Sequence, residues 1–374
     1  MAYLKKIIFN IHLILGLASG IIFFIVAVTG CMYLFKPEIE RLTQPYRSVE
    51  AKQQAFLPPS KLIHIAENVF PERHIHGVSY GQQEDAAEVQ FYESSFHHGI
   101  FINPYSGDIL KVKNYEKDFF DWVFHGHYQL WLPQKTGKFV VSTATLIFVV
   151  LLITGIVLWW PRKGSKRSSF RIQWKAPWKD RIFDLHNVLG FYAGLVLLVI
   201  AITGLAWGYQ WFSQMLYSAT GGEKELNFKI PDSDTTSSNT KNIPPMDYVW
   251  KKMHNDYPDA AMIEIHTPPK GKAIFAFVKP DEQTYWESQY RYFDPNTLEE
   301  KEVETIWGKI ENANTADKIK RLNYDIHTGA IAGLPGKILV FFASLIGASL
   351  PVTGCLMWIR REREKQKLKS KMKI

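Results

Sequence analysis

The chain has 374 residues, 47% of them hydrophobic, and a formal net charge of +8. Its mean hydropathy is only −0.12, so the apolar residues must be clustered along the chain. The Lys and Arg residues gather beside these clusters, which argues against a nucleic-acid-binding function and for a membrane protein. The two cysteines form no Cys-x-x-Cys-His motif, which excludes covalent attachment of a c-type haem.

Four apolar segments are long enough to cross a membrane. About 20 residues span the hydrocarbon core of a bilayer, and each of these segments has at least 22 residues with almost no charge. The first runs over 29 residues, which is too long for the apolar part of a signal peptide, so we expect an uncleaved span. The segments cover residues 7–35, 139–160, 188–212 and 338–359.

The distribution of charge predicts the orientation of the spans. Residues 161–182 carry eight Lys/Arg and one acidic residue, and residues 359–374 carry eight and two. The positive-inside rule places both segments in the cytoplasm, together with both termini. The loops 36–126 and 213–320 are mildly acidic, and we expect them to face outward.

The two outer loops follow one plan. Each is expected to begin with a short helix and to continue with strands that end at an Asn-Pro or Asp-Pro turn. We predict two small α+β modules of one type, each inserted between two spans. Residues 219–243 are rich in Gly, Ser, Thr and Asn and are expected to form a flexible linker without regular structure. The predicted helices cover 61–70 and 245–257, and the predicted strands cover 86–92, 99–102, 261–266, 273–278 and 288–293.

The predicted fold class is a mainly α membrane protein with four transmembrane helices in two span-module-span repeats. In chain order we expect span 1 (1–35), module 1 (36–116), an outer helix with span 2 (117–160), a basic cytoplasmic loop (161–182), span 3 (183–213), a linker with module 2 (214–320), span 4 (321–359) and a basic cytoplasmic tail (360–374).

Two histidines begin the first and third apolar runs with the same spacing. His12 precedes the pair Thr29-Gly30 by 17 residues, and His186 precedes Thr203-Gly204 by 17 residues. An ionisable side chain inside or beside a membrane span is costly, so it indicates a function.

Two further histidines repeat this arrangement more loosely. His127 precedes Thr154-Gly155 by 27 residues, and His327 precedes Thr353-Gly354 by 26 residues. A single histidine near a span end is more often an interfacial residue, and a single Thr-Gly pair is usually a helix-packing feature. The fourfold repetition favours a shared function instead.

The repeat predicts which histidines meet. If the two halves pack around an axis along the membrane normal, His12 faces His186 near the cytoplasmic side, and His127 faces His327 near the outer side. Imidazole in a helix bundle is a common axial ligand for haem iron. We therefore predict two bis-histidine haem b sites, with these four side chains as the iron ligands. The small residues of the Thr-Gly pairs are expected to clear space for the flat macrocycle.

His125 competes with His127 for the outer site. His125 lies seven residues before Leu132-Pro133, as His327 does before Leu334-Pro335. The spacing to Thr154 favours His127, and so does the presence of a polar residue two positions earlier, which all four histidines share. We choose His127 and keep His125 as the alternative. The shared polar residues are expected to cap helices or to orient the rings; they are Asn10, His125, Asp184 and Asp325.

These motifs resemble the PepSY-associated transmembrane family, whose members include haem-containing ferric-siderophore reductases of the bacterial inner membrane. The resemblance covers nearly the whole chain. Besides the four Thr-Gly pairs, it is carried by Leu185-His186-Asn187-Val188-Leu189-Gly190, Gly126-His127-Tyr128-Gln129-Leu130-Trp131-Leu132-Pro133, Asp325-Ile326-His327-Thr328-Gly329, Trp159-Trp160-Pro161-Arg162 and the outer turn Asn103-Pro104-Tyr105-Ser106-Gly107-Asp108-Ile109-Leu110.

The resemblance implies a multi-pass inner-membrane ferric-chelate reductase with two haem b groups, PepSY-like outer modules and a ferric siderophore as substrate. It implies a possible TonB-dependent siderophore uptake system as a partner. The chain has no Gly-x-Gly-x-x-Gly nucleotide fingerprint, so electrons are expected from quinol or a separate cytoplasmic reductant. Two alternatives stay open: a non-catalytic accessory for siderophore or peptide transport, and a haem-handling membrane protein.

Overall fold

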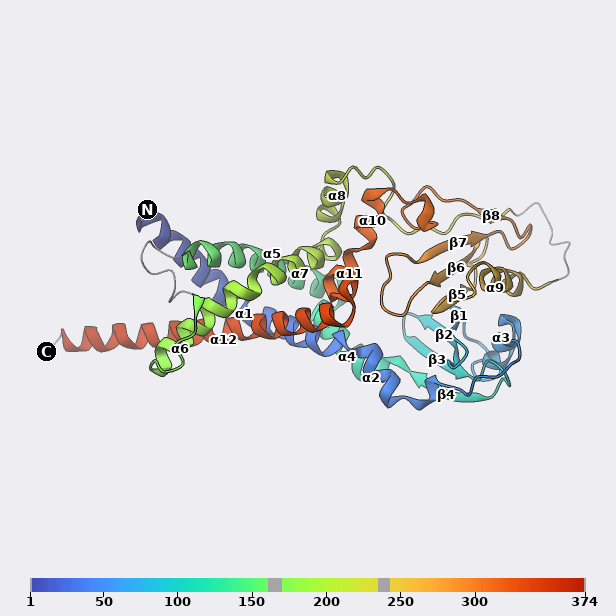
Figure 1. Ribbon diagram of the computed structural model, residues 1–374, viewed down its shortest axis with the longest axis horizontal. Helices are drawn as coiled ribbons and strands as arrows, with labels where there is room; N and C mark the ends of the chain where they lie inside the picture. The colour runs from blue at the N-terminus through green and yellow to red at the C-terminus, as the bar shows by residue number, and fades with distance from the viewer. Residues whose placement is uncertain (1, 161–169, 235–242, 373–374) are drawn as a thin grey trace. The chain divides into compact units, whose positions relative to one another are not determined.

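The computed structural model describes residues 2–160, 170–234 and 243–372 (Figure 1). The chain divides into two compact units. The first, called the helical unit, comprises Met1–Phe35, Trp122–Ser213 and Ile326–Ile374. The second, called the sheet unit, comprises Lys36–Asp121 and Gln214–Asp325.

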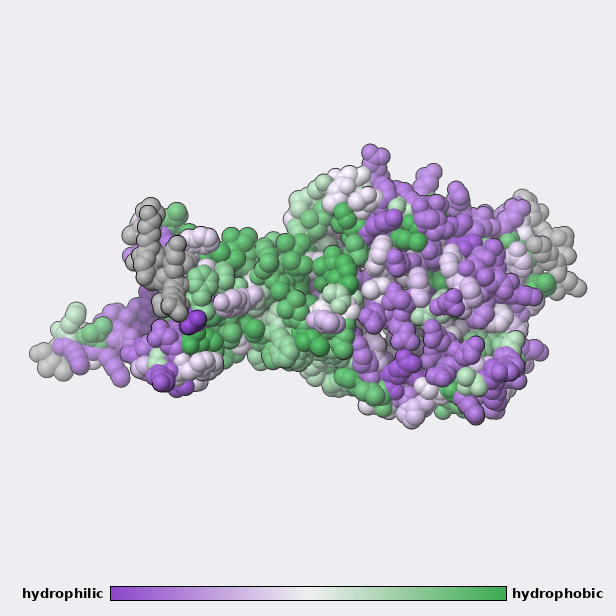
Figure 2. Space-filling model, viewed as in Figure 1, coloured by the Kyte–Doolittle hydropathy of each residue, from purple (hydrophilic) through white to green (hydrophobic). Residues whose placement is uncertain are grey.

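Four long apolar helices build the helical unit. They are α1 (Ala2–Leu34), α5 (Gln134–Trp159), α7 (Gly190–Gly208) and α12 (Gly333–Lys371). All four are long and apolar enough to cross a membrane, which confirms the prediction of four spans. Their outward side chains are apolar too, as Leu195 and Phe139 show with 71% and 63% exposure. Figure 2 shows this apolar surface over the helical unit. A lipid environment accounts for it, because soluble proteins rarely expose so continuous an apolar surface.

The four spans pack side by side. Helix α1 packs against α5 and α12, and α7 packs against the same two helices. Small residues at the contacts, such as Ala193 and Ala343, let the backbones approach closely. Phe23 of α1 stacks on Phe148 of α5 in this core, with 3.6 Å between the ring centroids.

Short helices precede three of the spans. Helix α4 (Phe119–Gln129) precedes α5, and α11 (Asn323–Thr328) precedes α12. Helix α6 (Trp178–Asp184) and a π-helical turn, Leu185–Leu189, lead directly into α7. The helix then ends at Gly208, because Tyr209 is extended, and α8 (Gln210–Ala219) begins at the next residue.

The sheet unit contains one antiparallel sheet of eight strands in the order β4-β3-β2-β1-β5-β6-β7-β8. The strands of the two predicted modules are joined where β1 pairs with β5, Gly77 opposite His266 and Tyr80 opposite Ile263. This pairing covers one edge strand from each set of four. The strands are β1 (Gly77–Tyr80), β2 (Ala87–Glu93), β3 (Phe96–Ile102), β4 (Ile109–Asn114), β5 (Met262–His266), β6 (Ile274–Lys279), β7 (Gln289–Phe293) and β8 (Glu300–Lys301).

Two helices supply the core of the sheet unit. Helix α3 (Pro59–Glu67) packs on β1 and β2, and α9 (Pro245–Asp256) packs on β5 and β6. Leu62 and Met253 are fully buried among these strands, and each contributes roughly 1.5–3 kcal/mol through burial of apolar surface. The backbone N–H and hydroxyl of Ser60 both donate to the Asp247 carboxylate, at 2.8 and 2.6 Å, and tie the two helices together.

The predicted linker is partly ordered. Within residues 219–234, Glu225 bridges to Thr305, and Asp232 bridges to Lys272. Phe228 packs on Phe275 of the sheet with 5.0 Å between the ring centroids. Residues 235–242 of the linker lie outside the described residues, as do 161–169 of the basic loop, including Pro161 and Arg162 of the predicted motif.

The remaining described elements are short. They are α2 (Lys36–Thr43), α10 (Thr315–Arg321) and the 3₁₀ turns Pro45–Arg47, Tyr115–Lys117, Ile310–Asn312 and Ala330–Ala332.

Candidate cofactor sites in the helical unit

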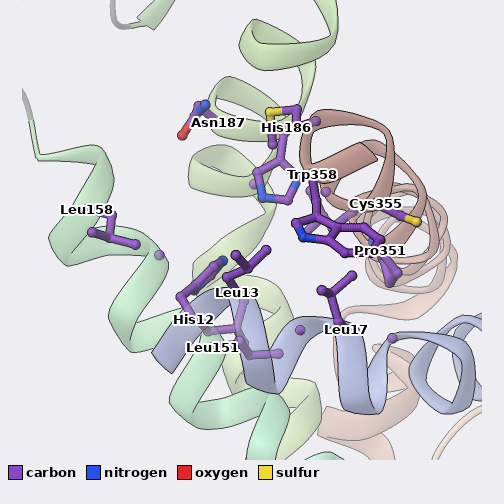
Figure 3. Close-up of a pocket in the computed structure, with 18 of the residues that line it drawn as sticks. His12, Leu13, Leu17, Leu151, Leu158, His186, Asn187, Pro351, Cys355 and Trp358 are labelled. Atoms are coloured by element: carbon purple, nitrogen blue, oxygen red, sulfur yellow. The ribbon is translucent and has the colours of Figure 1, made fainter. Parts of the chain in front are cut away.

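His12 and His186 face one another across the helical unit and are called the inner pair. His12 lies on α1, and His186 lies on the π-helical turn before α7. Their ring centroids are 6.4 Å apart, and the ring planes are nearly perpendicular, at 88°. Figure 3 shows both side chains in one pocket, reached from different helices. Such π-helical turns are frequent at functional sites because the extra residue re-aims a side chain.

His127 and His327 form a second arrangement of the same kind, called the outer pair. His127 lies on α4 and His327 on α11. Their ring centroids are 6.3 Å apart, with 66° between the planes. The ring of Trp207 lies 5.1 Å from that of His327. The structure therefore brings together both pairs that the repeat predicted.

His125 does not take the place of His127. Its Nδ1 lies 2.9 Å from the side-chain nitrogen of Gln129, one turn further along α4. Because the Gln129 amide donates, this nitrogen of His125 is the acceptor. His127 is the histidine of α4 whose ring faces His327.

Each ring packs against the glycine of a Thr-Gly pair on a neighbouring span. A Cβ atom added at Gly155, Gly354 or Gly204 would lie 3.4 Å from Cε1 of His12, His186 or His327, respectively. At Gly30 the added atom would lie only 2.9 Å from Cε1 of His127. The glycines were expected to clear space for a macrocycle, but in the structure they first make room for the imidazole rings.

The threonines fix the rings of the inner pair. The Nδ1 atom of His12 lies 2.9 Å from Oγ1 of Thr154, and that of His186 lies 2.9 Å from Oγ1 of Thr353. Each threonine hydroxyl donates its own proton to a backbone carbonyl one turn earlier in its helix, at 2.8 and 3.0 Å. Its oxygen is then left to accept, so Nδ1 of each histidine must be the donor.

Backbone carbonyls fix the outer pair. Nδ1 of His127 lies 2.8 Å from the carbonyl oxygen of Val26, and Nδ1 of His327 lies 3.1 Å from that of Ile200. Since a carbonyl can only accept, Nδ1 carries the proton in both rings. His327 also reaches Oγ1 of Thr203, at 3.0 Å. In all four neutral rings the lone pair is therefore on Nε2, the state in which imidazole binds a metal.

Two of the polar residues that precede a histidine by two positions, Asp184 and Asp325, bond to backbone groups and not to the imidazole rings. Asp325 accepts from the backbone N–H groups of Tyr285 and Trp286, at 3.0 and 2.9 Å. Asp184 accepts from the backbone N–H of Gln173, at 3.0 Å. These carboxylates hold loops, so the expectation that they orient imidazoles is wrong. The threonines of the Thr-Gly pairs could have been predicted as the groups that orient the rings, because the hydroxyl oxygen of a helical threonine can still accept a hydrogen bond.

A cavity of ≈ 480 Å³ surrounds the inner pair. Its wall is mostly aliphatic and aromatic, and five glycines contribute to it: Gly16, Gly20, Gly155, Gly190 and Gly354. The volume falls within the range of roughly 300–1,000 Å³ that is usual for cofactor and ligand sites. Such a wall suits a flat apolar group.

The side chains fit an iron held by a macrocycle better than a bare ion. Among the described residues there is no group of three or more His, Cys, Asp or Glu side chains that could hold a metal ion. A haem supplies four nitrogens itself and needs only two axial ligands from the protein. Each pair supplies two imidazoles from different helices, with ring centroids 6.4 Å apart in the inner pair and 6.3 Å apart in the outer pair.

The sheet unit has its own pair of ionisable groups, both mostly but not fully buried. Nε2 of His266 lies 3.4 Å from a carboxylate oxygen of Glu264. Burial raises the pKa of Glu264 to about 7, with the nearby Glu88 adding to the effect. Burial lowers the pKa of His266 to about 3, with His76 contributing less. Both groups are therefore largely neutral in the folded chain near pH 6.

Four apolar helices long enough to cross a membrane, together with an antiparallel sheet unit, define a multi-pass membrane protein. The sequence matches the PepSY-associated TM region family over residues 9–361, and the chain therefore belongs to that family. This confirms the family that the sequence motifs indicated. No curated protein matches the sequence.

Proposed function

We propose that the chain is a di-haem b oxidoreductase of the bacterial inner membrane that reduces a periplasmic ferric siderophore and releases Fe(II) for uptake. The observation that carries this proposal is the presence of two histidine pairs at different depths of one bundle. The ring centroids lie 6.4 and 6.3 Å apart, and the hydrogen bonds made by Nδ1 leave Nε2 of each ring to bind a metal.

The four histidines have defined tasks in this proposal. His12 and His186 would hold the inner haem, and His127 and His327 the outer one. A bound haem supplies one-electron chemistry. Thr154, Thr353 and the backbone carbonyls accept from Nδ1, which keeps each ring in the correct tautomer and makes Nε2 a stronger donor. The chain's own contribution is thus ligation and orientation.

In this proposal the two pairs would form a route for electrons across the membrane. His12 and Gly30, which contacts His127, are 18 residues apart on α1, or about 27 Å at about 1.5 Å per residue. Apolar side chains line the bundle between them, including the stacked rings of Phe23 and Phe148. Electrons would enter near the inner pair, from quinol or a cytoplasmic donor.

The two-fold organisation of the chain belongs to the same proposal. We infer that the chain consists of two copies of one span-module-span unit, with two PepSY-like modules in the periplasm and both termini in the cytoplasm. The strand order, which is symmetric about the β1–β5 contact, supports the duplication. The basic residues of 170–182 and of the C-terminal part of α12 support the orientation.

A redox difference spectrum tests the proposal. The protein is expressed with adequate haem supply and purified in detergent, and spectra are recorded with dithionite and with ferricyanide. We expect b-type bands and two haems per chain that remain bound through purification. Absence of b-type bands would rule out the reductase and favour a non-catalytic transport accessory. Bands that disappear during purification would favour a haem-handling protein.

A second experiment tests the substrate. Reduced protein is mixed anaerobically with ferric siderophores of several chelate classes, and Fe(II) is trapped with a chromogenic chelator. Because each Fe(III) takes one electron, a chain with two reduced haems should yield two Fe(II) on full reoxidation. Haem that stays reduced with every chelate class would exclude ferric chelates as the acceptor.

A further inference from the structure

One cation lines the apolar cavity around the inner pair. Arg361 lies on α12 seven residues after Gly354, the glycine that contacts His186. Seven helical residues rise about 10 Å. Gly354, Trp358 and Arg361 all line the cavity, so this face of α12 continues from the imidazole to the guanidinium. Arg361 is the single Lys or Arg among the described residues that form the wall.

The guanidinium of Arg361 is held in place by an aromatic ring. Its central carbon lies 4.8 Å from the ring centroid of Phe9. Phe9 precedes His12 by three residues on α1, or about 4.5 Å towards the N-terminus. The position of Arg361 on α12 and that of Phe9 on α1 both place the cation beyond the imidazoles, towards the end of the bundle that carries the N-terminus.

The N–H groups of the Arg361 guanidinium can donate hydrogen bonds to a ligand. Among the described residues, no carboxylate lies within 4.0 Å of its guanidinium, whereas the neighbouring Arg360 pairs with Glu364 at 3.0 Å. The Asn187 amide, which also lines the cavity, already donates to the Phe183 carbonyl, at 2.8 Å. The Arg361 side chain is exposed, and an apolar cavity with a guanidinium at its end fits a flat apolar ligand with a carboxylate edge.

We propose that Arg361 binds the carboxylate edge of the cofactor in the inner cavity and fixes that edge towards the cytoplasmic end of the bundle. This inference rests on the proposed function, because haem b is the ligand with an apolar ring and two carboxylates. The guanidinium forms charge-assisted hydrogen bonds that slow release of the cofactor. Its positive charge also stabilises the reduced state, so it raises the midpoint potential of the inner haem.

The test compares three variants of the full-length chain in detergent: R361M, R361K and R360M. The R360M variant removes an adjacent charge that does not line the cavity, and so it controls for net charge. Haem loss is followed as transfer to an excess of a haem-free scavenger globin, and the midpoint potentials are measured by redox titration. The outer haem in each variant reports that the chain is folded.

We expect R361M to lose its inner haem about fivefold faster than the wild type, the change that an exposed ion pair near 1 kcal/mol supplies. R361K should lie between them because lysine keeps the charge but not the planar fork. The inner potential should fall in R361M and stay unchanged in R360M, and the difference should shrink at high salt.

Two outcomes are distinguished. If R361M and R360M match in release rate and potential while the wild type binds two haems, the role of Arg361 is overturned and the proposed function stands. If the wild type binds no haem in the inner cavity, both fail together. A His127→Ala background, which retains the inner haem alone, assigns the measured release to the inner site.

Discussion

The inner and outer histidine pairs reach nearly the same geometry by different constructions. The ring centroids are 6.4 Å apart in one pair and 6.3 Å in the other. In the inner pair, His12 lies on a span and His186 on the π-helical turn that leads into one, and threonine hydroxyls orient both rings. The outer pair lies on short helices before the spans and reaches backbone carbonyls. The two pairs therefore differ in the groups that hold the rings, although their ring separations are nearly equal.

The pairs also differ in how tightly the rings are enclosed. The inner rings line a cavity of ≈ 480 Å³. In the outer pair, His127 is pressed against Gly30, where an added Cβ would lie 2.9 Å away instead of the 3.4 Å found at the other three glycines. The outer site should therefore tolerate less change. The four predictions below test this contrast, from the largest expected effect to the smallest.

Removing one ligand should remove one haem and leave the other. We expect His186→Ala to lose about half of the bound haem, and His327→Ala to lose the other half. The matched control is His125→Ala, which should keep both haems because that ring bonds with Gln129 rather than facing His327. The pyridine haemochrome assay counts the haems. A full complement in His186→Ala would contradict the inner pair.

Replacing a glycine by alanine should affect haem affinity more at the outer site than at the inner site. Gly30→Ala brings a Cβ into the ring of His127, and we expect outer-haem affinity to fall by about tenfold, because misplaced second-layer groups cost 10- to 100-fold in metal sites. Gly155→Ala, with its looser 3.4 Å contact, should have a much smaller effect on the inner haem. Equal losses in a haem titration of the two variants would show that the difference in packing has no consequence.

Removing threonine hydroxyls should affect the inner pair most. Thr154→Val and Thr353→Val each remove an acceptor for Nδ1, so inner-haem affinity should fall by about tenfold. Thr203→Val should cost less, since His327 keeps the Ile200 carbonyl. Thr29→Val is the control, because His127 bonds to the Val26 carbonyl. A loss in Thr29→Val as large as in Thr154→Val would refute this assignment of acceptors.

A change in the sheet unit should leave both pairs untouched. Since burial raises the pKa of Glu264 to about 7, its neutral form stabilises the fold at low pH, and this contribution is lost as pH rises through 7. Glu264→Gln should therefore be more stable than the wild type at pH 8 by about 2 kcal/mol and similar at pH 5. Thermal unfolding at both pH values checks this, with the haem spectrum unchanged. Equal melting temperatures at pH 8 would contradict it.

Much of the helical unit could be predicted from the sequence because its signals are periodic. Uncharged segments with more than the 20 or so residues needed to cross a bilayer predict the spans. His12 and His186 each precede a Thr-Gly pair by 17 residues, and this equal spacing predicts that their rings meet. His125 and His127 could not be separated by spacing, because two residues along α4 change the face of the helix, which only the packing reveals. The π-helical turn at His186 also left no pattern in the sequence.

The sheet unit was less predictable because its defining contact is non-local. Strands β1 and β5 lie far apart in sequence, and their pairing depends on two uncovered edges meeting, which no local pattern records. Strands β1 and β8 have only four and two residues, so their alternation is too brief to stand out, and β4 is exposed along most of its length. Threonine is not predicted as the acceptor, because the more polar Asp184 and Asp325 stand two residues before His186 and His327, yet these carboxylates bond to loop N–H groups.

The central claim is that two bis-histidine haem sites occupy one chain. The most direct measurement is the haem stoichiometry of the purified full-length protein, combined with electron paramagnetic resonance of its oxidised form. The account predicts two low-spin haems per chain, one lost in His12→Ala and the other in His127→Ala. A single haem that survives both substitutions, or no haem after expression with adequate supply, would contradict it.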